Sequence, residues 1–368
     1  MQKALHFLKQ EPVLCVAALL ALLSMCFVPP SAQYLSYIDF RVLSILFSLM
    51  AVVEGAAGLG LFRLLARRLL LRAGSGKRLI AVLVMLCFWS SMLITNDVAL
   101  LTFVPLSLLL LRPAGQGAVI YTITLQTIAA NLGSMLTPVG NPQNLYLYSH
   151  YQMGAGSFFS LMLPLGGASF VLILIALLFA PAGSLMLRSE EAPSASTAAH
   201  AVSYVILFGL CLLGVFRVLP YESVLAATAV GVFVLDRSVY RRMDYGLLAT
   251  FACFFLFVGN LGNIEAVRVF LSSVMEGREF LLSVLLSQGI SNVPAALMLS
   301  GFTERANTLL LGTNVGGLGT LVASLASLIS FRLYARSEGA QPGKYLLWFT
   351  LANLIFLALL LPPALLLE

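Results

Sequence analysis

Long apolar stretches alternate with short polar segments along the whole chain, a pattern typical of helices that cross a membrane. A crossing needs about 20 mostly apolar residues, and the pattern predicts nine full spans plus two shorter pairs of apolar segments. The first spans cover roughly 12–28 and 40–58. The chain has 368 residues, of which 60% are apolar and 10% charged, and a mean hydropathy of +0.99. We therefore expect an all-α polytopic protein in the lipid bilayer.

Polar interruptions divide several of the apolar stretches. Residues 79–111 form two pieces of about 14 to 17 residues, each only about 21 to 25 Å long as a helix and so short for a hydrocarbon core about 30 Å thick. A re-entrant hairpin with Ile94–Asp97 (ITND) at its tip is the preferred interpretation, and a pair of short spans stays open. The interruptions lie at 95–97, 131–144, 291–294 and 313–319. Broken helices in a membrane are expected to be buried or to line a cavity, because unpaired backbone groups are costly in hydrocarbon.

Three segments of the first half recur in the same order in the second half. VEGAAGLGLFR from Val53 is echoed by VGNLGNIEAVR from Val258, ITNDVALL from Ile94 by ISNVPAALM from Ile290, and ANLGSMLTPVGNP by GTNVGGLGTL from Gly312. This order predicts an internal duplication. The expected organisation is a first transmembrane repeat at 1–181, a cytoplasmic linker at 182–200, an extra connecting helix at 201–220, and a second repeat at 221–368. The extra helix inverts the second repeat, and inverted repeats are an architecture of secondary transporters.

The charges predict an orientation in the membrane. With both hairpins returning to their own side, sixteen of the 21 Lys and Arg residues lie on the cytoplasmic side, including those of an amphipathic helix with arginines at 63, 67, 68 and 72. The expected location is the plasma or inner membrane, with a cytoplasmic N-terminus and an extracytoplasmic C-terminus. The net charge of +6 sits in short loops, so no nucleic-acid partner is expected.

The residue types at the interruptions suit a transport site. Glycines allow unwound backbone close to a ligand, prolines stop helices, and asparagines offer neutral donors and acceptors. Helix N-termini at such breaks attract anions, while carbonyl and side-chain oxygens can bind Na⁺. The structural alternative is that these residues cap helices and hold the bundle together. The candidate substrate-binding residues are Thr95, Asn96, Asn131, Gly133, Thr137, Gly140, Asn141, Asn144, Ser291, Asn292, Thr313, Asn314 and Gly316.

Two carboxylates are candidates for ion coupling. Asp97 stands inside an apolar region, where a carboxylate is costly and usually functional, and its counterpart in the second half is Val293. We expect Asp97 to bind H⁺ or Na⁺, with Asn96 and Asn131 contributing, against an alternative role in capping the hairpin. Glu54, near the end of an apolar helix, is a weaker candidate because its side chain can reach the membrane surface.

Other classes of function find little support in the sequence. The five cysteines lie inside apolar runs without a CxxC pair, so neither disulfides nor a structural zinc site is expected. No motif of a hydrolase, metalloprotease or embedded aspartyl protease is present, and we expect no enzyme activity, no cofactor and no resident metal. An ion channel is disfavoured by the plan of two repeats with broken helices.

The interruptions resemble those of the ion transporter superfamily, which includes citrate-metal symporters, arsenical pump membrane proteins and divalent anion:sodium symporters. TND at Thr95, TPVGNPQNL at Thr137 and GTNVGGLGTL at Gly312 carry the resemblance, which covers almost the whole chain. It implies two inverted repeats, hairpin tips that meet broken helices near the midplane, an elevator-like motion, and commonly a homodimer.

Two departures bear on the substrate. The carboxylate symporters carry Ser-Asn-Thr in both halves, whereas the matching positions here read Thr95-Asn96-Asp97 and Ser291-Asn292-Val293. No arginine occurs at any break, so dipoles, amides and hydroxyls would have to hold an anion. The predicted function is secondary transport of a small anion, a citrate-like carboxylate or an oxyanion, driven by Na⁺ or H⁺. The alternative is efflux of arsenite or antimonite by proton antiport, because neutral arsenite would suit such a site.

Overall fold

The computed structural model describes residues 11–60, 75–181 and 196–368, and these ranges contain helices and turns but no strand. Asp39 and Asp244 begin two corresponding helices in the same way, because each side chain accepts the backbone N–H three residues later, at 2.9 and 3.1 Å. The helices of the first half are α2 (Pro12–Met25), α3 (Tyr34–Tyr37), α4 (Phe40–Gly58), α6 (Gly76–Ile94), α7 (Asn96–Leu110), the short 3₁₀ helix η1 (Arg112–Ala114), α8 (Gln116–Ser134), α9 (Pro142–His150) and α10 (Ala155–Leu178).

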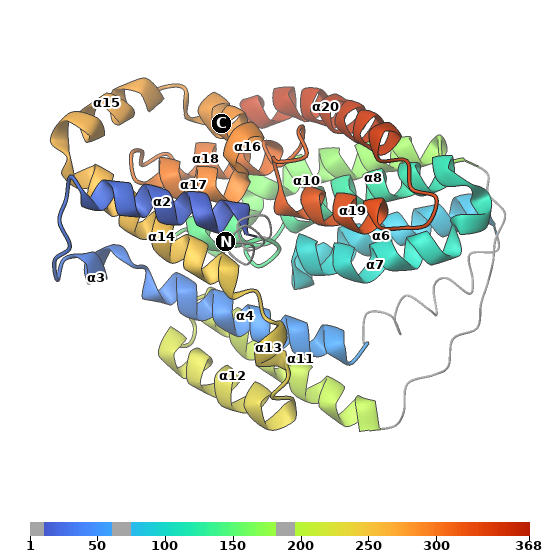
Figure 1. Ribbon diagram of the computed structural model, residues 1–368, viewed down its shortest axis with the longest axis horizontal. Coiled ribbons are helices and arrows are strands. Elements are labelled where there is room, and N and C mark those ends of the chain that lie inside the picture. The colour runs from blue at the N-terminus through green and yellow to red at the C-terminus, as the bar shows by residue number, and fades with distance from the viewer. Residues whose placement is uncertain (1–10, 61–74, 182–195) are drawn as a thin grey trace, which may run out of the picture.

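The second half follows the same order after one additional helix, α11 (Ser196–Val215). A short helix again precedes a long one, and a hairpin again precedes a broken helix (Figure 1). Its helices are α12 (Tyr221–Leu235), α13 (Val239–Arg242), α14 (Tyr245–Asn263), α15 (Glu265–Met275), α16 (Glu279–Ile290), α17 (Asn292–Ser300), α18 (Ala306–Val315), α19 (Leu325–Ala335) and α20 (Pro342–Leu366).

The helices pack in two groups, and each group contains helices from both halves of the chain. Helix α2 packs against α14, and α4 packs against α12 and α11; Figure 1 shows α4, α11, α12 and α13 together at the lower edge. In the other group α6 and α7 pack against α8, and α16 and α17 pack against α18. Helix α19 contacts α7 while α17 contacts α9, so each hairpin touches the broken helix of the other half.

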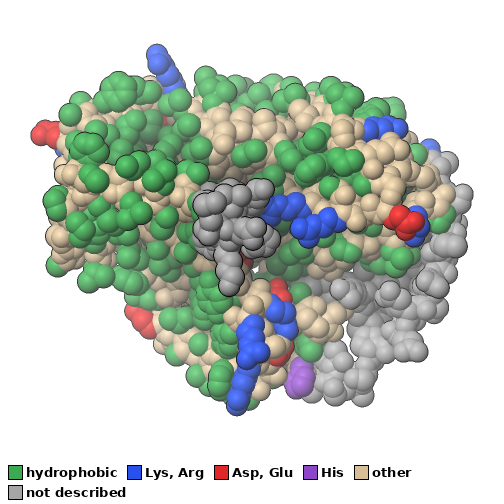
Figure 2. Space-filling view, viewed as in Figure 1, with side chains coloured by type: hydrophobic (Ala, Val, Ile, Leu, Met, Phe, Trp, Pro, Cys, Tyr) green, Lys and Arg blue, Asp and Glu red, His purple; other side chains and the backbone are tan. Residues whose placement is uncertain are grey.

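Five helices in the described residues are long and apolar enough to cross a membrane, namely α4, α6, α10, α14 and α20, and six shorter apolar helices accompany them. Hydrophobic side chains are spread over much of the face in Figure 2. The fold is that of an all-α polytopic membrane protein, as the hydrophobic pattern predicts. Four of these five, α4, α10, α14 and α20, are among the nine expected spans, and the fifth, α6, is an arm of the first hairpin. Of the other expected spans, two are broken into pieces, α2 and α12 contain only 14 and 15 residues, and α11 counts among the shorter apolar helices.

Several predicted boundaries need correction. The first arm of the hairpin, α6, has 19 residues and is longer than expected, whereas the second arm, α7, has 15. The linker expected at 182–200 ends earlier than predicted, because α11 begins at Ser196. The amphipathic helix expected around residues 63–72 lies outside the described residues. The division into an inverted pair of repeats stays a prediction.

Three of the interruptions are narrower than the sequence indicates, and the fourth, in the second broken helix, lies later in the chain and is slightly longer. A single residue, Thr95 or Ser291, separates the two arms of each hairpin. The first broken helix is unwound only over 135–141 and the second over 316–324. Residues 131–134 and 313–315 are therefore helical, because helical backbone runs to Ser134 and Val315 before it is interrupted.

Gly140 is required by a close approach inside the first break. A Cβ atom at this position would lie 2.1 Å from the carbonyl oxygen of Ser134, which is backbone and cannot turn aside. We expect Gly140→Ala to destabilise the protein by about 1–3 kcal/mol, the usual cost of overpacking, measured by thermal unfolding of the purified protein. Gly156→Ala in α10 is the matched control, since a Cβ there meets nothing within 4 Å. Equal unfolding temperatures for both variants would contradict this packing.

The predicted orientation has a direct test. A reporter fused after Glu368 is expected to be extracytoplasmic, because the charge distribution predicts a cytoplasmic N-terminus and the extra helix α11 is predicted to invert the second repeat. Alkaline phosphatase and a fluorescent protein serve as opposite reporters. A signal from the fluorescent protein alone would overturn the predicted number of spans.

Candidate functional site

The tips of the two hairpins have the same backbone conformation. Thr95 has φ 67° and ψ 151°, and Ser291 has φ 75° and ψ 153°, a region that residues other than glycine occupy at a cost of about 1–3 kcal/mol. Each tip is held on the unwound segment of its own half. The N–H of Asn96 donates to the carbonyl of Gly140 at 3.2 Å, and the N–H of Asn292 donates to that of Ala323 at 3.0 Å.

Five asparagine side chains gather where the breaks meet, and we call Asn96, Asn131, Asn141, Asn144 and Asn314 the amide cluster. Asn131 is its first centre: its Oδ1 accepts from Asn96 Nδ2 at 2.9 Å and from Ser324 Oγ at 3.0 Å. Its Nδ2 donates to the Gly317 carbonyl at 3.5 Å. Asn131 therefore joins the first hairpin to the second break.

Asn314 is the second centre of the amide cluster. Its Nδ2 donates to Asn144 Oδ1 at 2.6 Å and to the Leu310 carbonyl at 2.7 Å, and its Oδ1 accepts from Asn141 Nδ2 at 3.2 Å. All five amides are buried, the most exposed being Asn131 at 6%. The two broken helices are thus joined by neutral hydrogen bonds in a place where unpaired polar groups would be costly.

Two cavities meet beside Asp97. The first, about 180 Å³, is lined by Glu54, Thr95, Asn141 and Arg242 among others. The second, about 130 Å³, is lined by Glu11, Arg332 and Val293 among others. Asp97, Asp244, Leu247 and Ile329 line both. The carboxylate of the first hairpin therefore lies between two small spaces, each of which also holds an arginine.

The carboxyl group of Asp97 has an incomplete set of partners. Its Oδ1 is buried and accepts no hydrogen bond from the described residues. The backbone N–H of Asp97 donates to Asn96 Oδ1 at 3.0 Å, which ties the residue to the amide cluster. A buried carboxylate oxygen without a donor is available to a proton or a cation.

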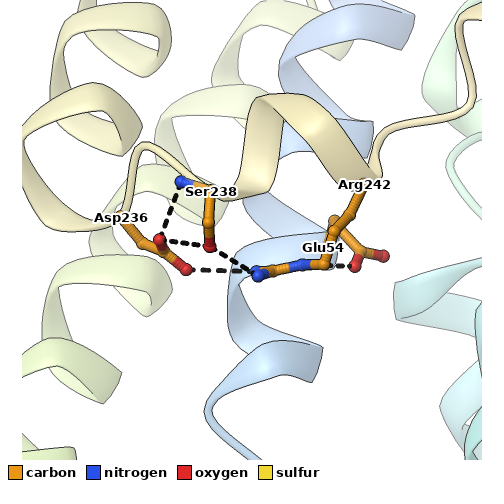
Figure 3. A network of polar contacts seen from close by, with 4 residues as sticks. All are labelled: Glu54, Asp236, Ser238 and Arg242. Atoms are coloured by element: carbon orange, nitrogen blue, oxygen red, sulfur yellow. Dashed lines mark hydrogen bonds and ion pairs between the residues drawn. The ribbon is translucent and has the colours of Figure 1, made fainter.

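Glu54 also lines the first cavity and belongs to the network of Figure 3. Its Oε1 accepts from Arg242 Nε at 3.1 Å, and Arg242 Nη2 contacts Asp236 Oδ2 at 3.1 Å. The Ser238 hydroxyl donates to Asp236 Oδ1 at 2.6 Å; this hydrogen bond, with Arg242, holds the pKa of Asp236 below its ordinary value. Glu54 is thus neutralised by a partly exposed arginine, and among the described residues it makes no hydrogen bond to the amide cluster.

The remaining predicted residues lie in different surroundings. Gly133 is helical and packs α8 on α6, because a Cβ would lie 2.1 Å from the Phe88 carbonyl oxygen. Thr313 is also helical, and its hydroxyl donates to the Leu309 carbonyl at 2.7 Å. Thr137 donates to the Met92 carbonyl, and Gly316 ends α18 with ordinary helical φ of −63°. Gly133 therefore lies in helical backbone and not in an unwound segment, whereas Gly316 lies at the start of the second break. A role of Thr313 in substrate binding stays a prediction.

The sequence reasoning missed three charged residues and one amide. Arg242, Arg332 and Asp244 reach the cavities from loops and helix ends. The absence of arginine predicted around a bound anion therefore holds only for the breaks themselves.

Gln288 holds the second break: its Nε2 donates to the Gly316 and Leu318 carbonyls, both at 2.9 Å, and its Oε1 accepts from the Thr320 N–H at 2.9 Å. The sequence signal that could have indicated Gln288 is its position, three residues before the hairpin tip at Ser291, where a polar amide interrupts an apolar helix.

The sequence profile of the citrate transporter family matches residues 8–326. The chain belongs to this family. The transporter is 31% identical over 316 residues to an uncharacterized transporter of Methanocaldococcus jannaschii, covering 84% of this chain and 85% of that protein. It is 30% identical over 299 residues to the inner membrane protein YbiR of Escherichia coli, with 80% of each covered.

A shorter similarity links 34% of the transporter to 26% of the silicon efflux transporter LSI3 of Oryza sativa subsp. japonica, at 33% identity over 127 residues. These relatives confirm the resemblance to the ion transporter superfamily. The protein is a multi-pass membrane transporter.

Arg242 offers a test of the first cavity. We expect Arg242→Gln to raise the apparent KM for an anionic substrate about tenfold or more, because hydrogen bonds to charged groups contribute about 1.5–3 kcal/mol. Stability should change by less than about 1 kcal/mol, since Arg242 and Glu54 are 40% and 30% exposed. Uptake kinetics in proteoliposomes measure the effect. Arg336→Gln is the control. An unchanged KM for Arg242→Gln would show that Arg242 forms ion pairs but does not bind the substrate.

Proposed function

We propose that the protein is a secondary active transporter of a small anion, a citrate-like carboxylate or an oxyanion, driven by Na⁺ or H⁺. The observation that carries the proposal is the unpartnered Asp97 oxygen between two cavities. The driving ion binds at Asp97. The anion binds next to it in the first cavity, between Thr95 and Asn141 on one side and Arg242 on the other.

The charges around the first cavity explain how binding of the ion and of the anion would depend on each other. An anion and a cation that bind side by side attract each other strongly away from bulk water, so ion binding at Asp97 raises the affinity for the anion. Without the ion, the negative charges of Asp97 and Asp244 oppose an anion in the same cavity. This mutual dependence is what couples one flux to the other.

The amide cluster supplies the part that moves. Its hydrogen bonds join the first hairpin to both broken helices through neutral groups. The N–H of Asn292 ties the second hairpin to the carbonyl of Ala323 in the second break, so these elements can shift as one body against α2, α4, α12 and α14. We propose an elevator-like motion of this kind, in a homodimer, as the resemblance implies.

A second candidate is efflux of arsenite or antimonite by proton antiport. It is favoured by the amide cluster itself, which presents only neutral groups, and by Asp97 as a group that can exchange a proton. A neutral oxyacid would need no arginine and would bind against amides and the Thr95 hydroxyl. One relative is named a silicon efflux transporter.

A thermal-shift screen of the purified protein separates the candidates. Citrate, smaller carboxylates, sulfate, phosphate and arsenite are each added with and without Na⁺ at two pH values. A ligand at one hundred times its Kd stabilises the folded state by about 2.7 kcal/mol. We expect a carboxylate or oxyanion to stabilise the protein more when Na⁺ is present or the pH is lowered. A shift with arsenite alone would favour the second candidate, and no ion dependence with any ligand would contradict coupling.

A further inference from the structure

A third cavity of about 660 Å³ lies between α8, α10 and α20, and it shares no lining residue with the two cavities beside Asp97. Its size falls within the range of about 300–1,000 Å³ found for small-molecule sites. The walls are mainly apolar, with Leu125 and Ile128 from α8, Ala176 from α10, and Trp348 and Phe356 from α20. We call this space the groove.

Lys344, in the first turn of α20, lines the groove at one end, and we call this end the mouth. Tyr334 connects the beginnings of α8 and α20, because its hydroxyl donates to Gln116 Oε1 at 2.9 Å and accepts the N–H of Gln341 at 2.9 Å. The lining runs along α20 from Lys344 to Phe356, a distance of about 18 Å at 1.5 Å per residue. Half of a hydrocarbon core is about 15 Å thick, so the groove has the depth of one leaflet.

The mouth carries one uncompensated positive charge. Lys344 is exposed in the first turn of α20 and has no ion pair within the described ranges. The neighbouring Glu338 is neutralised by Arg112 at 2.6 Å. The first turn of a 25-residue helix adds the positive end of its dipole. An anionic group is therefore favoured at this end and an apolar group along the rest.

A hydroxyl in the wall lacks a partner. Thr124 lines the groove, is 4% exposed, and its Oγ1 has no hydrogen bond to the described residues. The neighbouring Thr122 and Thr127 donate to the carbonyls four residues earlier, both at 2.8 Å. Thr124 is thus a buried donor in an apolar wall, and a carbonyl acceptor inside the groove would satisfy it.

We propose that the groove binds one anionic phospholipid. An acyl chain lies along Leu125, Ile128 and Phe356, the phosphate lies beside Lys344 and the start of α20, and an ester carbonyl accepts from Thr124. The charge distribution puts Lys344 on the cytoplasmic side, where anionic lipids are concentrated. Trp348 beside the mouth fits the preference of tryptophan for the membrane interface.

Native mass spectrometry of the purified transporter tests the proposal. The protein is titrated with phosphatidylglycerol or with phosphatidylcholine of the same chain length. Lys344→Gln should weaken binding of phosphatidylglycerol about fivefold, since one surface lysine contributes about 1 kcal/mol, and should leave phosphatidylcholine unchanged. Ala352→Phe fills the groove and should reduce the binding of both lipids at least tenfold. Leu351→Phe, one residue along on the exposed face of α20, is the matched control.

The other outcomes are decisive as well. Equal lipid binding by Ala352→Phe and Leu351→Phe, with unchanged unfolding temperatures, would overturn the groove as the site. Competition by inorganic phosphate alone would show an anion site without a lipid. A bound mass equal to a second copy of the chain that is lost in Ala352→Phe would make the groove a protein interface.

Discussion

Replacing Asp97 with Asn is expected to abolish ion-driven accumulation of the substrate while the protein stays folded in the membrane. The Oδ1 atom of Asp97 is buried without a donor from the described residues, and it lies where the two cavities meet. Asparagine keeps the size of the side chain but removes the charge that binds the driving ion. Uptake into proteoliposomes should fall to the level of empty vesicles under either a pH or a Na⁺ gradient.

Asp39→Asn is the matched control for this change. Asp39 begins α4 by accepting the Val42 N–H at 2.9 Å, and asparagine makes the same bond. Its transport should equal that of the unaltered protein. Normal accumulation by Asp97→Asn under one of the two gradients would show that Asp97 does not couple transport to that ion.

Changing Asn131 and Asn314 together to Leu is expected to remove substrate binding. Each is a centre of the amide cluster, and the double change removes the hydrogen-bond partners of Asn96 Nδ2 and Asn144 Oδ1 and one of the two partners of Asn141 Nδ2. Each buried group left without a partner costs about 1–3 kcal/mol, so the breaks should no longer be held in the geometry that forms the first cavity. Binding is measured by the thermal shift that the best ligand of the screen produces.

Asn353→Leu controls for the loss of a buried asparagine. Asn353 lies in α20, is fully buried, and within the described part of the chain donates only to the carbonyl of Phe349 in its own helix. Its ligand-induced shift should be unchanged. Unaltered binding by the double variant would show that the substrate site lies elsewhere.

Much of the fold could be predicted from the sequence, because apolar length and helix-breaking residues act locally. Pro142 at the first position of α9, with the Asn141 side chain accepting the Asn144 N–H at 2.9 Å, restarts the first broken helix where the proline indicates. The tips at Thr95 and Ser291 follow from the repeated pattern of two apolar arms around an asparagine.

The second break was placed too early because a glycine does not have to break a helix. Gly316 has helical φ, whereas Gly319, with φ +108°, adopts a conformation that favours glycine. A Cβ at Gly319 would also lie 2.3 Å from Gln288 Oε1. The sequence alone does not distinguish these two glycines, because tertiary packing against Gln288 decides between them.

The charges around the cavities could not be predicted from local pattern. Glu54 and Arg242 are 188 residues apart in the chain, yet their side chains pair. Arg332 follows an apolar stretch, and the sequence predicts an ordinary cytoplasmic charge there. In the structure it lines the second cavity beside Asp97. Only the packing of α4, α13 and α19 around the first hairpin brings these residues together.

The most direct test of the account is an experimental structure of the transporter with the ligand that the thermal-shift screen selects. Density for the ligand in the cavity between Thr95, Asn141 and Arg242, next to Asp97, is the result that the account predicts. Density outside the cavities beside Asp97, with both of these cavities empty, would contradict it.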